Sequence, residues 1–337
     1  MTIKEIADLL GVSPTTVSNV IHGHAGKMSE DTRKRIEEAL VKYHYVHTGR
    51  GGTEETRELN MVLAVFFLGE KQHILTDPFC GRLLESIQKE LWKYGFHTVC
   101  ELPEKEEEII GELNARNVAG AIILGYELDK CESLARRVMK PVVFVDSGEG
   151  DYDNIGLDDY GGAYEMTSYM IRQCHKKIMF FTEYLGLTSH SDQERLRGFR
   201  QALEDHGIRY EPEDMIYLPG DRYLRHELLR QFARNKAGKI YTAGFFSSDL
   251  LANEAISVFF SQGVLVPEHF SVGGFDDNIY ARLSRPMLTT IRQDPEEKGI
   301  RAVRLLMKRI KGEPVRTGHL QLPTELIVRE SIKNIGR

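Results

Sequence analysis

Short apolar runs alternate with amphipathic helical stretches over most of the chain, from residue 59 onward. The apolar runs, which we interpret as buried strands, cover residues 61–68, 120–124, 141–145, 177–181, 239–243 and 270–274. Helical patterns occupy residues 79–94, 129–138, 159–174, 190–206, 222–235 and 248–260. Strands that alternate with helices predict parallel sheets covered by helices on both faces. Two such half-domains fit the length, and paired α/β domains bind ligands between the lobes, at the carboxyl ends of the strands.

Length and composition set outer limits on this interpretation. A chain of 337 residues is long enough for two or three domains, and 41% hydrophobic with 28% charged residues is typical of globular proteins. The four cysteines are Cys80, Cys100, Cys131 and Cys174. They lie far apart without a CxxC pair, which predicts buried, reduced thiols. The N-terminus lacks a secretory pattern, and no apolar run reaches the roughly 18 residues of a membrane helix, so we expect a cytoplasmic protein.

Residues 2–43 carry three helical patterns separated by turn signals. Thr2 is placed to cap the first helix, which Gly11 ends. Ser13 caps the second helix, and Pro14 occupies its first position, where a missing N–H costs nothing. The third helix opens at Ser29. Apolar residues recur at helical spacing on the inner side of the helices: Ile3, Ile6, Ala7, Leu10, Val17, Val20, Ile21, Ile36, Ala39, Leu40 and Tyr43.

The second of these helices is polar on its outer face, at Thr15, Thr16, Ser18, Asn19 and His22. Two short helices joined by a glycine-containing turn, with a polar second helix, predict a helix-turn-helix unit whose second helix fits the major groove of DNA. The alternative is a small helical bundle that packs against another protein. Charge does not separate the two, because residues 1–50 carry seven Lys and Arg against six Asp and Glu.

The order of residues in this segment is more specific than its periodicity. Residues 2–21 read TIKEIADLLGVSPTTVSNVI, which closely resembles the headpiece of the lactose-repressor (LacI/GalR) family. Residues 29–33 (SEDTR) and 43–45 (YHY) resemble the third helix of that headpiece. The resemblance implies a sequence-specific transcription regulator, a repressor whose affinity for DNA depends on a bound small molecule. It also implies a homodimer, and therefore a near-palindromic double-stranded operator.

The resemblance assigns DNA contacts to individual residues. Pro14, Thr15 and Asn19 fall at base-reading positions, whereas Thr16 and Ser18 fall at phosphate-contacting positions. The full set expected to face DNA is Thr2, Ser13, Pro14, Thr15, Thr16, Ser18, Asn19, His22 and Arg33. An asparagine amide can pair bidentately with adenine, which supports Asn19 independently. Pro14 can offer only an apolar contact, such as one to a thymine methyl group, or it serves merely to start the helix.

Residues 46–57 (VHTGRGGTEETR) depart from the family pattern. A hinge helix normally follows the headpiece and places a leucine wedge in the minor groove. Here Gly49, Gly51 and Gly52 disfavour a helix by about 1 kcal/mol each relative to alanine. No leucine occurs in this stretch, and its composition predicts a flexible tether. We therefore divide the chain into a headpiece (1–48), a Gly-rich linker (49–58) and a large domain for effector binding and dimerisation (59–337).

Further segments of the large domain resemble the same family. They are AGAIIL (119–124), PVVFVD (141–146), ERLRGF (194–199), GGFDD (273–277) and LTTI (288–291). Two segments differ from the pattern, since CHKKI (174–178) replaces the usual G-H-x-x-I and SSD (247–249) replaces A-N-D. The implied fold is an all-α helix-turn-helix headpiece followed by an α/β bilobed domain of the periplasmic-binding-protein type with parallel sheets.

The resemblance also implies a site between the lobes for a polar effector, such as a sugar or a nucleoside. Its expected lining is Asp77, Pro78, Phe79, Asp146, Arg195, Phe246, Ser248 and Asp276. A guanidinium and a carboxylate that face each other across a cleft, here Arg195 and Asp276, can hydrogen-bond adjacent hydroxyls or the edge of a nucleobase. Phe79 and Phe246 are placed to stack on a ring. The alternatives are a surface arginine, a turn aspartate and, for the two other aspartates, helix caps.

No motif for catalysis or cofactor binding can be recognised. The chain has neither a GxGxxG nor a GxxxxGK(S/T) run, and no nucleophile–base pair. Closely spaced histidines lack cysteine or acidic partners, so we expect no metal, no cofactor and no enzymatic activity. Two alternative classes are a solute-binding protein of the same fold, which would need an export signal, and an enzyme on a doubly wound scaffold, which would need a catalytic group at a strand end.

Overall fold

In the computed structural model the chain divides into two compact units, Met1–Arg57 and Glu58–Arg337. The structure describes residues 3–21, 28–42, 61–66, 77–103, 105–115, 118–138, 140–183, 189–314 and 316–336. The predicted linker, residues 49–58, lies outside these described residues. Each unit has a hydrophobic core of its own.

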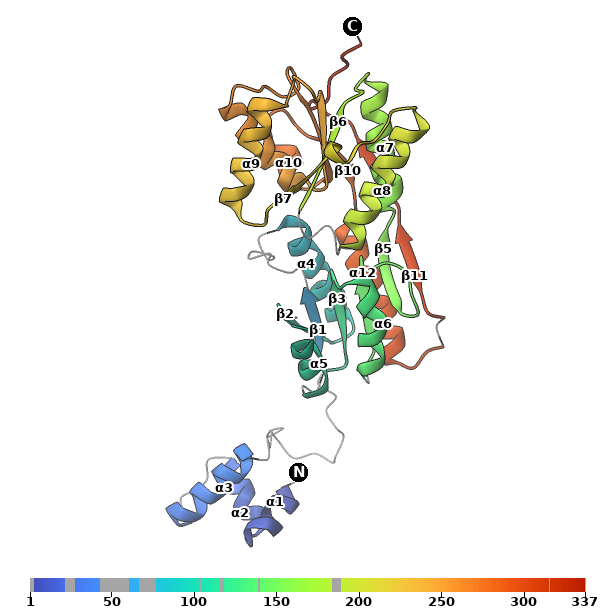
Figure 1. The fold of residues 1–337 in the computed structure, drawn as a ribbon. Coiled ribbons are helices and arrows are strands. Elements are labelled where there is room, and N and C mark those ends of the chain that lie inside the picture. The colour runs from blue at the N-terminus through green and yellow to red at the C-terminus, as the bar shows by residue number, and fades with distance from the viewer. Residues whose placement is uncertain are drawn as a thin grey trace. The chain divides into compact units, whose positions relative to one another are not determined.

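The N-terminal unit contains three helices, α1 (Ile3–Leu10), α2 (Pro14–Ile21) and α3 (Glu30–Lys42), which confirms the predicted helices (Figure 1). Gly11 adopts a φ of +65°, a left-handed conformation that ends α1 and that glycine takes without strain. At the start of α2, the backbone N–H of Thr16 donates to Ser13 Oγ at 3.1 Å, as expected of an N-cap. Buried residues from all three helices form the core: Ile6, Ala7, Val17, Ile36 and Ala39.

The large unit is built on two six-stranded sheets, and we call each sheet with its helices a lobe. The first sheet, in the order β11-β5-β4-β3-β1-β2, contains β1 (Met61–Phe66), β2 (His97–Glu101), β3 (Gly120–Leu124), β4 (Val142–Val145), β5 (Asp153–Leu157) and β11 (His319–Leu322). The second, in the order β12-β10-β9-β8-β6-β7, contains β6 (Ile178–Glu183), β7 (Met215–Leu218), β8 (Ala243–Phe246), β9 (Ser271–Asp276), β10 (Thr289–Arg292) and β12 (Glu325–Ile327). All described pairings are parallel except that of β10 with β12, which confirms the predicted parallel sheets.

Helices cover both faces of both sheets (Figure 1). The first sheet has α4 (Pro78–Lys93) and α12 (Pro295–Ile310) on one face and α5 (Glu106–Ala115) and α6 (Leu128–Arg137) on the other. The second has α7 (Asp159–Arg172) and α8 (His190–Asp205) on one face and α9 (Arg222–Asn235) and α10 (Asp249–Ser261) on the other. Two short elements complete the second lobe, the 3₁₀ turn Pro212–Asp214 before β7 and α11 (Ile279–Leu283).

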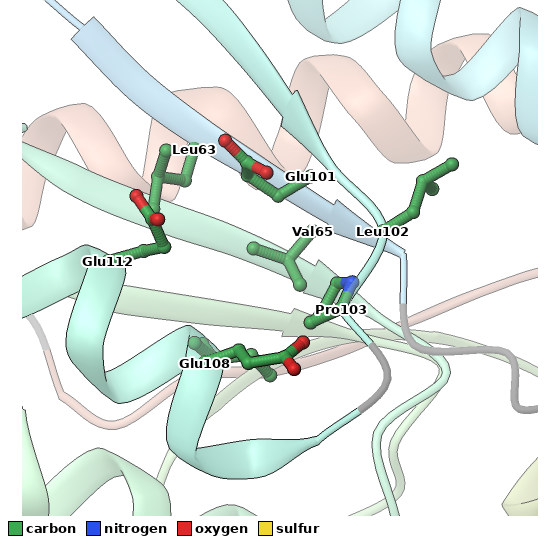
Figure 2. A pocket seen from close by; sticks show the side chains of 8 residues that line it. Leu63, Val65, Glu101, Leu102, Pro103, Glu108 and Glu112 are labelled. Atoms are coloured by element: carbon green, nitrogen blue, oxygen red, sulfur yellow. The ribbon is translucent and has the colours of Figure 1, made fainter.

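A cavity of about 190 Å³ opens on the α5 side of the first sheet (Figure 2). Apolar side chains of β1, Leu63 and Val65, line it together with carboxylates from β2 and α5. The cavity therefore lies on the face of this sheet opposite to α4 and α12.

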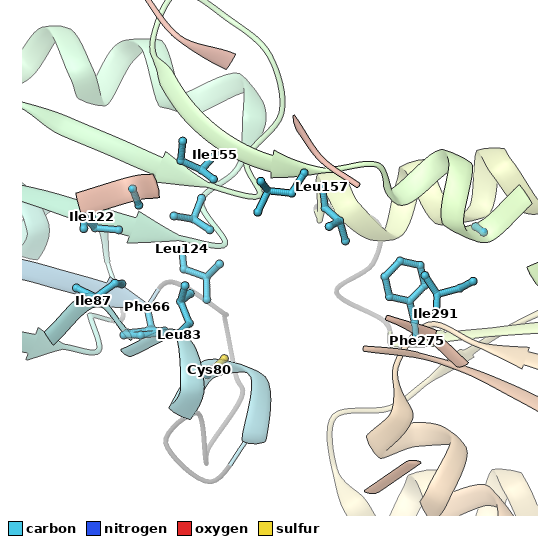
Figure 3. Packing of buried hydrophobic residues seen from close by; sticks show 14 of the residues in the cluster. Phe66, Cys80, Leu83, Ile87, Ile122, Leu124, Ile155, Leu157, Phe275 and Ile291 are labelled. Atoms are coloured by element: carbon cyan, nitrogen blue, oxygen red, sulfur yellow. The ribbon is translucent and has the colours of Figure 1, made fainter. Parts of the chain in front are cut away.

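The largest hydrophobic cluster extends through both lobes. Figure 3 shows its first-lobe residues, such as Leu124 and Leu157, and its second-lobe residues Phe275 and Ile291. Burying a Leu, Ile or Phe side chain fully contributes about 1.5–3 kcal/mol. The two lobes therefore share one source of stability on the α12 and α7 sides of their sheets.

The chain crosses between the lobes three times, as the sheet assignments show. It leaves the first sheet after Leu157 and enters α7 of the second lobe at Asp159. It returns after β10, because Pro295 begins α12, which packs on the first sheet. The last crossing follows β11 and leads to β12. Residues at these crossings lie between two sheets, where they can contact both lobes.

One predicted strand was wrong. The apolar run 239–243 is mostly a turn, in which the N–H groups of Lys239 and Ile240 both donate to the Lys236 carbonyl, and β8 begins only at Ala243. Apolar composition marked a buried turn here, because Tyr241 packs into the core with its hydroxyl on Asp214. Within the described parts of the chain, no helix is both long and apolar enough to cross a bilayer.

Candidate functional site

The outer face of α2 lies opposite the buried side chain of Val17. Thr15 and Asn19 are two residues before and after it, about 200° around the helix, so both point away from the headpiece core. Thr15 is exposed and Asn19 is half-buried. At the start of the helix, Ser13 Oγ and Thr16 Oγ1 are hydrogen-bonded at 2.8 Å. This face presents hydroxyl and amide groups, which can bond base edges and phosphates.

The other residues expected to face DNA occupy mixed positions. Pro14 is exposed at the first position of α2, Ser18 is half-buried on the same helix, and Arg33 is exposed on α3. Thr2 and His22 lie outside the described residues.

In the large unit, a buried lysine lies at the centre of the polar contacts between the lobes. Lys298 of α12 is 0% exposed, and its ammonium donates to both carboxylate oxygens of Asp146, at 2.8 and 2.7 Å, and to Gln293 Oε1 at 2.9 Å. These three bonds use all three N–H donors of the ammonium. The Phe79 ring centroid is 5.1 Å from Lys298 Nζ, within the range of a cation–π contact.

Gln293 extends these contacts to the second lobe. It lies just after β10, and its Nε2 donates to Asp276 Oδ1 at 2.6 Å. Asp276 ends β9 with a φ of +126°, and Asp146 follows β4 with a φ of +57°. Both conformations favour glycine, so each aspartate is held at a cost of about 1–3 kcal/mol. The contacts thus run from Asp146 in the first lobe through Lys298 and Gln293 to Asp276 in the second.

Arg195 of α8 is 9% exposed and joins the same region. Its Nε donates to Asp159 Oδ1 at 2.8 Å, one terminal nitrogen donates to the Ser247 carbonyl at 2.5 Å, and its guanidinium lies 3.7 Å from the Phe275 ring centroid. Asp159 is the first residue of α7, directly after a crossing. We call the six residues of both groups the hinge network: Asp146, Asp159, Arg195, Asp276, Gln293 and Lys298.

Burial and neighbouring charges change the titration of the hinge network. Burial raises the pKa of Asp276 to about 7; Arg195 opposes this rise and Asp77 adds to it. Burial likewise raises the pKa of Asp159 to about 6, again opposed by Arg195. Burial is the largest single effect on Arg195 and disfavours its charge, but the combined attraction of Asp159, Asp192 and Asp276 outweighs it, so the pKa of Arg195 is raised. Asp276 is therefore only partly ionised near neutral pH, whereas Arg195 stays charged.

Comparison with known proteins agrees with this architecture over the whole chain. Residues 2–47 match the family described as bacterial regulatory proteins, lacI family, and residues 167–332 match a periplasmic binding protein-like domain. The chain therefore carries a helix-turn-helix domain of the LacI family and a periplasmic-binding-protein-like domain. It is a DNA-binding transcription regulator with a helix-turn-helix unit and a bilobed periplasmic-binding-protein-like domain.

Individual relatives match this chain over nearly its full length. The HTH-type transcriptional repressor PurR of Haemophilus influenzae is 28% identical over 348 residues, covering 99% of each chain. The solved complex of the transcriptional regulator CelR with cellobiose is 27% identical with a TM-score of 0.73 and covers 98% of this chain and 99% of that one. A lac repressor dimer bound to operator and the anti-inducer ONPF shares the fold at 22% identity, with a TM-score of 0.71 and 99% coverage of each chain.

The structure changes the expected relation between Arg195 and Asp276. They were expected to face each other across the cleft, but α8 packs on β6 and Asp276 ends β9, so both residues belong to the second lobe. The carboxylate that the first lobe contributes is Asp146, and Lys298 and Gln293 connect it to Asp276 of the second lobe.

Three other expected lining residues have structural roles. Phe246 is 0% exposed, and its ring is stacked on Phe181 at 4.2 Å, so the structure does not support ring stacking on a ligand by this side chain. Asp77 caps α4, where Pro78 is the first residue, by accepting from the N–H groups of Phe79 and Cys80. Ser248 caps α10 in the same way.

Four buried polar residues near these contacts were missed from the sequence: Asp159, Asp249, Gln293 and Lys298. One signal for Lys298 was available, because it shares the buried stripe of α12 with Ala302 and Leu306, at i+4 and i+8. Asp249 is 0% exposed and accepts from Thr290 Oγ1 at 2.5 Å and from the Asn278 N–H at 2.9 Å. No comparable signal marks Asp249, since helix-start aspartates are usually caps.

The cysteines match the expectation of buried thiols only in part. Cys80 and Cys131 are buried thiols, but Cys100 is half-buried and Cys174 is exposed at a left-handed turn with a φ of +70°. The prediction of four buried thiols was therefore wrong for Cys174, since the turn that ends α7 holds it at the surface. Among the residues that the structure describes, no group of three or more His, Cys, Asp or Glu is placed to hold a metal ion.

Proposed function

We propose that this regulator is a repressor that binds a near-palindromic operator as a homodimer, in the cytoplasm, and that a polar small molecule changes its affinity for the operator. The proposed effector is sugar- or nucleoside-like and binds between the lobes. The headpiece would comprise residues 1–48, the tether 49–58 and the effector-binding and dimerisation domain 59–337. PurR, a full-length relative, is named a transcriptional repressor, and CelR was solved with cellobiose.

DNA reading is assigned to the outer face of α2. Thr15 and Asn19 lie opposite buried Val17, where an asparagine amide can pair with adenine in the major groove. Thr16 and Ser18 are proposed to contact phosphates, and so is Arg33 of α3. One headpiece reads only a few base pairs, so useful specificity requires two headpieces on a two-fold symmetric site, about one helical turn apart.

The observation that carries the effector proposal is the hinge network. Asp276 and Arg195 belong to the second lobe, and Gln293 and Lys298 connect Asp276 to Asp146 in the first. A hydroxyl-rich or heterocyclic ligand that hydrogen-bonds Asp276 competes with Gln293 for the same oxygen atoms. Ligand binding would then change the contacts that hold the lobes together, and the relative position of the lobes is the quantity that can reach the headpieces of a dimer.

The test is a gel-shift and footprinting series on DNA upstream of the protein's own gene, with purified full-length protein. Asn19→Ala should cost about 1–3 kcal/mol at the preferred sequence and relax discrimination at one base pair. Arg33→Ala is the matched control, which should weaken all sequences alike and reduce the salt dependence. A non-palindromic footprint, or a monomer by light scattering at micromolar concentration, would contradict the dimer.

Effectors are identified by a thermal-shift screen of sugars and nucleosides, and each hit is added to the gel shift. The proposal requires that at least one hit change operator affinity in the wild type. It also requires that Arg195→Ala or Asp276→Ala abolish both the thermal shift and the effect on DNA. A hit whose stabilisation survives both substitutions binds elsewhere.

A further inference from the structure

The hinge region of the large unit holds many more carboxylates than cations. Six described carboxylates, contributed by both lobes, interact electrostatically with Asp276, Asp159 or Arg195. They are Asp77, Asp146, Asp159, Asp192, Asp249 and Asp276. The described cations among the same groups are Arg195 and Lys298. Six carboxylates thus face two cations, and four of these eight side chains are buried: Asp159, Asp249, Arg195 and Lys298.

Both cations are already committed to partners within the protein. Lys298 has three N–H donors and makes three hydrogen bonds, to the two oxygens of Asp146 and to Gln293. Arg195 is paired with Asp159 at 2.8 Å and with the Ser247 carbonyl at 2.5 Å, and the Phe275 ring lies against its guanidinium. Lys298 has no N–H donor left for an added anion, and the charge of Arg195 is already paired with Asp159, so an added negative charge would meet no unpaired cation among these groups.

Asp276 is left without a cation in direct contact among the described residues. Its side chain accepts from Gln293 Nε2 at 2.6 Å and, at the limit of 3.5 Å, from Asn278 Nδ2. The charged groups that most affect the ionisation of Asp276 are Asp77 just before α4, Arg195 of α8, Asp249 of α10 and Lys298 of α12. The two hydrogen bonds use only part of the acceptor capacity of the Asp276 carboxylate. Two of the four charged neighbours are themselves carboxylates, so negative charge is in excess here.

We propose that the effector of this regulator carries a protonated amine, which pairs with the Asp276 carboxylate, and that anionic compounds such as sugar phosphates are excluded. This inference rests on the proposed function, because it names the chemical class of the ligand that binds at the same site. An ammonium supplies charge and up to three donors to a carboxylate that has only amide donors. A phosphate would add charge of the sign that is already in excess.

The proposal predicts the direction of the pH dependence of binding. The amine pairs with ionised Asp276, and burial raises the pKa of this group to about 7. The ionised fraction then rises from about one tenth at pH 6 to about nine tenths at pH 8. Binding of an amine that stays protonated over this range should therefore tighten about tenfold from pH 6 to pH 8, whereas a neutral ligand gains nothing from ionisation of Asp276.

Two matched triplets of probes, each a cation, a neutral isostere and an anion, test the proposal. The first is meglumine, sorbitol and sorbitol 6-phosphate, and the second is putrescine, 1,4-butanediol and succinate. Binding to the full-length protein is measured by thermal shift and titration calorimetry at pH 6 and pH 8. The variant Asp276→Asn keeps the shape, and asparagine tolerates positive φ. Asp129→Asn, an exposed carboxylate in the first turn of α6, is the matched control.

We expect the cation of at least one triplet to bind at least tenfold more tightly than its neutral isostere at pH 8. This preference should be lost in Asp276→Asn and kept in Asp129→Asn. Neutral or anionic probes that bind as tightly as the cation, or the absence of binding by any cation, would overturn the inference. The proposed function fails on different observations, namely no operator binding or no effector that changes it, so the two are tested separately.

Discussion

Removing the ammonium of Lys298 should destabilise the large unit more than a typical core substitution. In Lys298→Met, the side chain keeps much of its length, but Asp146 loses two hydrogen bonds, at 2.7 and 2.8 Å, and Gln293 loses one at 2.9 Å. Breaking one partner of a buried ion pair costs about 3–5 kcal/mol, because the remaining charge is left without compensation.

The exposure of the two side chains indicates where in this range the loss of unfolding free energy should fall. Lys298 is 0% exposed, but the Asp146 side chain is 12% exposed, so water can reach the carboxylate once its partner is removed. We therefore expect the lower end of the range, about 3 kcal/mol. At about 2.1 cal/mol/K of unfolding entropy per residue, 1 kcal/mol corresponds to slightly less than about 2 °C in Tm for the unit Glu58–Arg337, so Tm should fall by about 5 °C.

A double-mutant cycle that combines Lys298→Met with Asp146→Asn isolates the interaction energy between Lys298 and Asp146. When both charges are removed, neither partner is left buried and charged, so Lys298→Met with Asp146→Asn should cost clearly less than the sum of the two single substitutions. Urea unfolding and calorimetry of all four proteins provide the free energies. A loss below about 1 kcal/mol for Lys298→Met, or additivity of the two substitutions, would refute a coupled buried pair.

Three further predictions concern packing, pH and the tether. Gly299→Ala should destabilise the α4–α12 contact by about 1–3 kcal/mol, because an added Cβ would lie 1.9 Å from Ser86 Oγ; an unchanged unfolding midpoint would show that the helices can separate freely. Since the folded pKa of Asp276 is raised to about 7, its contribution to stability is fully present near pH 4 and is lost as pH rises through 7; Asp276→Asn should flatten this part of the stability profile measured by thermal melts. The Gly-rich tether at 49–52 should let operator binding tolerate one or two base pairs of altered half-site spacing and limit effector coupling to about 1 kcal/mol; a steep loss of affinity in gel shifts at the first altered spacing would show that the segment orders on DNA.

The central strands of the large unit could be predicted from sequence because buried parallel strands are continuous apolar runs. β1, β3 and β9 are buried on both faces, and their patterns identified them. The strands that were not predicted are β2, β5, β7, β10, β11 and β12. β2 (His97–Glu101), for example, lies at the end of its sheet and mixes polar with apolar residues. Length and hydropathy alone could not separate the turn near Lys239 from a strand.

The candidate site was predicted less completely, for a physical reason. The family resemblance implied that Arg195 and Asp276 line the site. It did not indicate that both residues belong to the same lobe. Lys298 is 152 residues from Asp146 in the chain, and a lysine in a charged helix is usually solvated. Only the packing of α12 against the first sheet shows that this lysine is buried and paired.

The crossings explain why these polar residues can act on both lobes. Asp159 begins α7 directly after β5, and Gln293 lies between β10 and α12, so each is fixed to both sheets by its own backbone. Gln293 donates to Asp276 and accepts from Lys298, which makes its amide a direct connection between the two lobes. A ligand group that displaces this amide from Asp276 also frees Oε1 to move away from Lys298. The structure shows Gln293 bound to both residues, and under the proposed function a ligand would produce a second arrangement in which Gln293 is displaced. Such a two-state element is the physical requirement for coupling between sites.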